Sequence, residues 1–258
     1  LGQGAAGAAI ATTIGNMLAA LYYLWYFLKK SRRFSLAPKD ALCGTHIAVR
    51  VCSAGFPTAI FSALMCVSTI VLNLILVVYG NAPVAAIGIV FKANMFITFL
   101  QMGLANGVQP IFGYSYGAGD IKRFADTERF TKLCCFVVGL AATALYFFLR
   151  EPIIGLFVGD SDVITYGVQM LIAYMLSGPF IGSLFVNMNC MQSVGRALPA
   201  TVLSVLRQGL LLIPLLYLLN VIAGLNGVIY GQSITDYITI ILSCVVWRRI
   251  RRGLEQRT

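Results

Sequence analysis

Charged side chains are scarce in this sequence, where they make up 11% of the 258 residues and only nine of them are acidic. Soluble domains carry about 25% charged residues, so this composition excludes an ordinary soluble protein. Hydrophobic residues, by contrast, reach 59%. The balance predicts an all-α, polytopic membrane protein, because helices satisfy their own backbone hydrogen bonds within lipid.

Residue types that build catalytic and metal sites are equally few. The single histidine, His46, has no partner that completes a metal site, and none of the seven cysteines forms a CxxC pair. No nucleophile with an adjacent base and no phosphate-binding loop is visible. We therefore expect no metal, no cofactor and no enzymatic activity.

Basic residues outnumber acidic ones and give a net charge of +10. They lie at the ends of apolar runs, in residues 29–33, 122–132, 196 and 248–252, and do not gather on one stretch as nucleic-acid binding requires. This is the positive-inside pattern of membrane proteins. We expect these ends, the C-terminus included, to face the cytoplasm, and we expect no nucleic-acid partner.

Seven apolar segments are long enough to cross a bilayer, which takes about 20 residues. They span residues 5–28, 53–79, 83–108, 130–149, 163–191, 198–219 and 222–247. Pro57, Pro110, Pro179 and Pro214 lie inside four of them and predict helix kinks. Gly103 with Gly107, and Gly178 with Gly182, have the spacing of close helix packing.

The segment 83–108 carries polar side chains on two faces of a helix. Lys92, Phe99 and Asn106 recur at i, i+7 and i+14, while Asn94 and Gln101 lie opposite. Two interpretations stay open: amides that hold helices together, or a helix that lines a polar cavity. The same alternatives apply to four amide residues near this segment and in other segments. These are Asn73, Gln109, Asn187 and Gln192.

Asp236 is the only acidic residue deep within an apolar segment, and it shares one helix face with Gln232. A carboxylate at that depth can bind Na+ or take up a proton, which are the tasks of an ion-coupling site. It can equally form a structural ion pair. Arg207 lies at a matching depth in the preceding segment, and Lys92 is a second possible partner. Glu128, within a basic stretch, is expected to be solvated, and Asp160 and Asp162 are expected to cap a helix.

An odd number of segments with an external start suggests that earlier helices are missing from this chain. An internal repeat supports that hypothesis. Residues 1–33 align with residues 221–253 at a constant offset of 220, so that Gly4 matches Gly224, Gly7 matches Gly227 and the basic clusters coincide. The offset predicts parallel six-helix units, an arrangement found in secondary transporters.

Several motifs resemble the multidrug and toxic compound extrusion (MATE) family over nearly the whole chain. They are GAAIAT in the first segment, GFP at 55–57, QPIFGYSYGAG at 109–119, FVGDSD at 157–162, QSVGRALP at 192–199 and LRQGLLLIP at 206–214. The resemblance implies two six-helix lobes around a central cavity. Residues 1–30 would then be the last helix of the first lobe, 31–52 a cytoplasmic linker, 53–247 the second lobe and 248–258 a basic tail. The missing N-terminal lobe would be its partner.

The resemblance also implies an activity: export of cationic, amphipathic small molecules in exchange for Na+ or H+ by alternating access. Some members carry a Glu where this chain has Met65, and some an Asp where it has Gly195 and Arg196. The carboxylate site of those members is therefore not reproduced. Two alternatives remain: a lipid-linked oligosaccharide flippase of similar architecture, which Lys92 and Arg207 would suit, and a seven-helix receptor.

Overall fold

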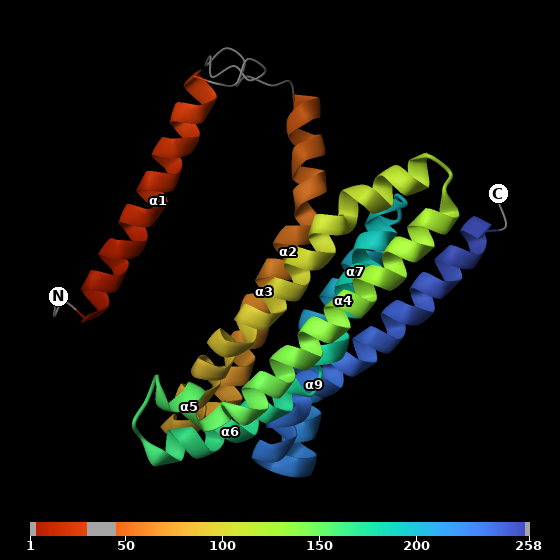
Figure 1. The fold of residues 1–258 in the computed structure, drawn as a ribbon. Coiled ribbons are helices and arrows are strands. Elements are labelled where there is room, and N and C mark those ends of the chain that lie inside the picture. The colour runs from red at the N-terminus through yellow and green to blue at the C-terminus, as the bar shows by residue number, and fades with distance from the viewer. Residues whose placement is uncertain (1–3, 30–44, 256–258) are drawn as a thin grey trace. The chain divides into compact units, whose positions relative to one another are not determined.

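The computed structural model describes residues 4–29 and 45–255, and these residues form helices joined by short turns (Figure 1). Contacts divide the chain into two units, residues 1–55 and 56–258. The first unit holds α1, Gly4–Lys29, and the start of α2, Thr45–Val77. Most of the predicted linker 31–52 lies outside the described residues, so the predicted domain boundaries stay a prediction.

The second unit continues α2 and contains the remaining elements. They are α3 (Asn81–Gly117), α4 (Ile121–Phe148), α5 (Arg150–Gly155), α6 (Ser161–Met175), α7 (Gly178–Ser193), α8 (Ala197–Val205), the π-helical turn η1 (Leu206–Leu210) and α9 (Leu212–Glu255). No strand occurs in the described ranges. The predicted all-α membrane protein is confirmed.

The breaks between these helices follow from local chemistry. The Asp120 side chain accepts the Arg123 amide at 2.9 Å and begins α4. Asp160 accepts the Asp162 amide at 3.0 Å and begins α6, which confirms the capping expected there. Gly119, with φ of 72°, makes the turn between α3 and α4 in a conformation that favours glycine.

Two of the four prolines coincide with irregular backbone. Pro179 stands in the first turn of α7, just after a break at which α6 and α7 bend by 46°. Pro214 has no amide hydrogen to donate to the carbonyl of Leu210, and the π-helical turn η1 ends at that residue. Pro110, in contrast, lies within the uninterrupted helix α3.

Helix α9 contains a reversal at Gly224, whose φ of 57° and ψ of −138° are not helical. A Cβ atom on Gly227 would lie 2.1 Å from the carbonyl oxygen of Leu219, and one on Gly231 would lie 2.8 Å from Leu216. Residues on both sides of Gly224 therefore pack against each other (Figure 1). The reversal matches the two separate spans, 198–219 and 222–247, that the sequence predicts.

Four helical runs among the described residues are long and apolar enough to cross a membrane, or five if the bent pair α6 and α7 is one span. One of the four is the 57-residue run Ala197–Gly253, which contains the reversal at Gly224. The predicted total of seven spans thus stays a prediction, whereas a multi-pass membrane protein is supported.

Helix α3 is the element that positions the rest, because it packs against α4, α6 and α7. The fully buried Gln101 donates to the carbonyl oxygen of Gly178 at 2.9 Å and to that of Cys135 at 3.4 Å. A Cβ atom on Gly182 would lie 2.4 Å from the Cβ of Cys135. The packing expected of Gly182 is confirmed. Gly103, however, has no described atom within 4 Å of such a position.

We predict that Gly227→Ala destabilises the protein, because its methyl group would overlap the Leu219 carbonyl oxygen. Overpacking of this kind costs about 1–3 kcal/mol. The apparent unfolding temperature in detergent measures the effect. Gly113→Ala is the matched control, since nothing lies within 4 Å of its added methyl group. Equal unfolding temperatures for the two variants would contradict the close approach at Gly224.

Candidate functional site

The carboxylate of Asp236 lies inside the second unit and contacts three side-chain donors. Arg207 Nε is 2.7 Å and Gln232 Nε2 is 3.1 Å from its Oδ1 atom, while Ser177 Oγ is 3.0 Å from Oδ2. Asp236 is only 3% exposed. A charge buried this far from water needs such partners, because isolating it from solvent is costly. We call these four residues the Asp236 cluster.

The three donors to Asp236 lie in three different backbone settings. Arg207 lies in the π-helical turn η1, and its guanidinium lies 5.9 Å from the ring centre of Phe185. Ser177 lies in the break between α6 and α7, and Gln232 precedes Asp236 by one helical turn on α9. Irregular backbone thus brings polar groups from two distant stretches of sequence to one carboxylate, and the third donor comes from the same helix as Asp236.

The Ser177 hydroxyl has two acceptors and one proton. Its Oγ atom lies 3.0 Å from Asp236 Oδ2 and 3.2 Å from the carbonyl oxygen of Tyr174. A hydroxyl rotates freely enough to serve either acceptor. The cluster therefore contains a donor that can leave Asp236 without losing its hydrogen bond.

Of the two cationic partners considered for Asp236, the structure contains the one at matching depth. The Arg207 and Asp236 side chains are 14% and 4% exposed, so their ion pair is buried. Lys92 is exposed and forms no ion pair with any described residue. The site thus holds one negative and one positive charge, together with neutral donors.

The other predicted polar residues lie apart from Asp236. Asn189 donates to Asn106 at 2.9 Å, and Gln109 donates to Gln192 at 3.2 Å, so both pairs join α3 to α7. Asn187 is fully buried and donates to Ser243 on α9 at 3.0 Å. Asn73 on α2 is half-buried, with no hydrogen bond to a described side chain. The structure places these amides, but their role as binding residues stays a prediction.

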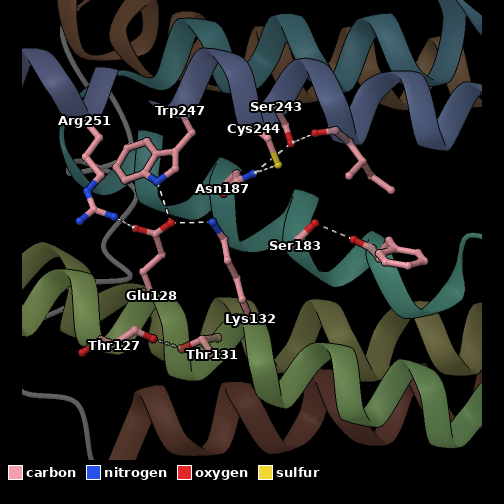
Figure 2. Close-up of polar contacts among 12 residues, drawn as sticks. Thr127, Glu128, Thr131, Lys132, Ser183, Asn187, Ser243, Cys244, Trp247 and Arg251 are labelled. Atoms are coloured by element: carbon pink, nitrogen blue, oxygen red, sulfur yellow. Dashed lines mark hydrogen bonds and ion pairs between the residues drawn. The ribbon is translucent and has the colours of Figure 1, made fainter. Parts of the chain in front are cut away.

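The expectation that Glu128 is solvated is wrong. Glu128 is 4% exposed, and its Oε1 atom accepts from Lys132 Nζ at 2.5 Å and from the Trp247 indole at 2.8 Å (Figure 2). Arg251 approaches Oε2 at 3.5 Å. Its burial results from α9, whose Trp247 lies 119 residues further along the chain. Neighbours in sequence gave no signal of this contact.

We predict that Glu128→Ala lowers the stability of the protein in detergent more than Glu128→Gln. The Gln side chain keeps an oxygen that accepts the Trp247 indole hydrogen, whereas Ala leaves that buried donor unpaired, at about 1–3 kcal/mol. Unfolding followed by tryptophan fluorescence measures both changes. Asp126→Ala, at an exposed position of the same helix, is the control and should be near neutral. Equal losses for all three variants would contradict the contact.

Comparison with known proteins places this arrangement in a family. The model of the MatE family matches residues 57–218. The chain belongs to the MatE family. The match covers α3, α4, α6 and α7 together with the Arg207 and Ser177 positions, whereas Gln232 and Asp236 lie beyond its end.

Similar proteins agree with this assignment. A multidrug export protein MepA from Staphylococcus saprophyticus is 30% identical over 248 residues, 96% of this chain and 54% of its own length. One from Staphylococcus aureus is 31% identical over 255 residues, 98% of this chain and 55% of its own. An outward-facing multidrug resistance MATE family transporter has a TM-score of 0.81 at 18% identity, over 99% of this chain and 58% of that one. The MatE chain therefore spans about half the length of these relatives.

The stability of the MatE chain should depend on the Asp236 pair in a non-additive way. Removing one partner of a buried ion pair costs about 3–5 kcal/mol, because the other charge stays buried without compensation. We therefore predict that Arg207→Gln and Asp236→Asn each destabilise strongly. The double variant should recover much of the loss, because no uncompensated charge remains. Thermal unfolding of the four proteins in detergent measures the coupling.

Additive losses in that cycle would show that the 2.7 Å contact carries no interaction energy. Lys92→Gln is the control for removing a cation without a described partner, and it should change the unfolding temperature little.

Proposed function

We propose that the whole protein to which this chain belongs exports cationic, amphipathic small molecules across a bacterial cytoplasmic membrane, in exchange for Na+ or H+. Membership of the MatE family and relatives named as multidrug export proteins support export. The buried Asp236 cluster is the observation that carries ion exchange, because it is the one described place where a carboxylate lies deep within a span.

The proposed coupling step uses the balance of charge at Asp236. A proton or Na+ that neutralises the carboxylate competes directly with the Arg207 guanidinium, 2.7 Å away. Once Asp236 is neutralised, the Ser177 hydroxyl turns to the Tyr174 carbonyl oxygen, which is already at 3.2 Å. The cluster then no longer joins α9 to the break between α6 and α7.

Two irregular segments are placed to respond to that release. The 46° bend lies at Ser177, and the π-helical turn holds Arg207. Both are positions at which a helix changes direction with little loss of backbone hydrogen bonds. We propose that ion binding at Asp236 changes these bends and thereby alternates the access of the substrate site.

The proposed substrate surface is the exposed side of α3. Phe96 and Phe99 are 70% and 56% exposed, whereas Phe91 packs against Tyr174 with ring centres 5.8 Å apart. Exposed aromatic rings attract cationic ligands over their faces. We propose that the whole protein has an N-terminal lobe, that this lobe lies opposite this side, with Asn106 at the same face, and that the C-terminus is cytoplasmic.

The Arg207 ion pair favours this proposal over the flippase alternative. A pyrophosphate-binding cavity needs free cations, and here the charge of Arg207 is neutralised by Asp236. Of the two cations that suggested a flippase, only Lys92 is exposed.

Efflux of ethidium by the full-length protein in sealed vesicles tests the proposal, with an imposed Na+ or H+ gradient. We expect efflux by the unmodified protein to follow one of the two gradients. Asp236→Asn should remove most of the gradient-driven rate, because the neutral side chain neither takes up a proton nor supplies a charge that Na+ can neutralise. Asp162→Asn, which changes an exposed aspartate at the start of α6, should leave the rate unchanged.

The outcomes separate the two parts of the proposal. Efflux that survives Asp236→Asn at normal protein levels would make the Asp236 cluster structural and leave export intact. No efflux from the unmodified protein under either gradient would overturn export of such cations.

A further inference from the structure

A cluster of exposed cations lies where the start of α4 and the end of α9 meet. Its members are Lys122, Arg123, Arg129, Arg248, Arg249 and Arg252, all of them exposed. We call these six residues the basic patch. None of them forms an ion pair with a described residue.

Contacts between the two helices hold the halves of the patch together. The rings of Phe124 and Trp247 are 5.8 Å apart, and both side chains are buried. Glu128 accepts from Trp247 on α9 and from Lys132 on α4, and Arg251 lies 3.5 Å from its Oε2 atom (Figure 2). The ends of α4 and α9 are therefore fixed beside each other by groups that the patch does not use.

The charge of the patch is not balanced by nearby acids. Glu128, the buried acid of this region, already faces Lys132 and Arg251. Asp120 is engaged by the Arg123 amide as the cap of α4. Asp126 is the remaining exposed carboxylate of the first turns of α4. Among the described side chains, the six exposed cations thus outnumber the two exposed carboxylates near them, Asp120 and Asp126.

The patch residues border an apolar run on each of the two helices. In α4 the basic residues precede the apolar run that begins at Phe130, and in α9 they follow the run that ends at Trp247. Lysines and arginines directly beside a span, at this density, attract anionic lipids.

We propose that the basic patch binds the phosphate headgroups of anionic phospholipids. Arginines from two adjacent helices can surround one phosphate or hold several at once, and each guanidinium offers paired donors to phosphate oxygens. Lipid binding there adds to the Glu128 contacts between α4 and α9. The proposal does not depend on the exported substrate or on the coupling ion.

Native mass spectrometry of the protein with equal amounts of phosphatidylglycerol and phosphatidylcholine tests this inference. We expect the unmodified protein to retain phosphatidylglycerol preferentially. Combined Arg248→Gln, Arg249→Gln and Arg252→Gln should reduce that preference by roughly threefold or more, since each cation near the surface contributes attraction. Added salt should weaken the preference, because exposed charges are screened.

Two variants make the result decisive. Lysine at the same three positions keeps the charge and should keep the preference for phosphatidylglycerol, which separates charge from loss of folding. Arg150→Gln removes a cation at the opposite end of α4, where Arg150 lies 4.8 Å from the Phe147 ring centre, and should change nothing. No preference in the unmodified protein, or an equal preference in the triple glutamine variant, would overturn the proposal.

Discussion

A buried carboxylate that must have partners is the constraint from which much of this structure follows. Asp236 lies within an apolar span, where no water supplies hydrogen bonds. Gln232 on the same helix supplies one of its partners. The other two come from a helix break at Ser177 and a π-helical turn at Arg207. At Asp236, irregular backbone and buried charge therefore occur together.

Close packing also holds α3 against α4 and α7. Gln101 lies fully buried where α3, α4 and α7 meet, and its amide bonds to backbone carbonyl oxygens at Cys135 and Gly178. Gly139 leaves room for it, since a Cβ atom there would lie 2.3 Å from Gln101 Nε2. The amide nitrogen is thus satisfied in a space that larger residues would fill, whereas the Oε1 atom has no hydrogen-bond partner among the described residues. The bend between α6 and α7 therefore lies directly beside the contact of Gln101 with Gly178.

The sequence was informative where chemistry acts along a single segment. Depth within a span depends only on counting residues from its end, and this was enough to match Arg207 with Asp236. Helix capping at Asp160 is also local. The burial of Glu128 is not, because it depends on Trp247, which arrives from a helix that the local pattern does not describe. A basic stretch predicts that its acidic residues are exposed to solvent only where no other helix packs against it.

The glycines with small-residue spacing also show that a local pattern does not predict contacts between distant segments. Gly103 and Gly182 carry the same small-residue spacing, yet only Gly182 has a described neighbour where a Cβ atom would lie. Spacing identifies a helix face that permits close approach, but it does not say whether another helix is there. The position of a reversal such as Gly224 likewise decides which faces meet, and it depends on a backbone conformation that several glycines in the chain could adopt.

Glu128 and Asp236 are the buried acids among the described residues, and they differ in the charges around them. Glu128 faces two cations at the end of its helix, beside a surface that is itself positive. Asp236 faces one cation, and its remaining partners are neutral. An incoming cation must therefore compete with two positive groups at Glu128 but with a single guanidinium at Asp236. The same residue type is suited to holding helices together in one setting and to exchanging an ion in the other.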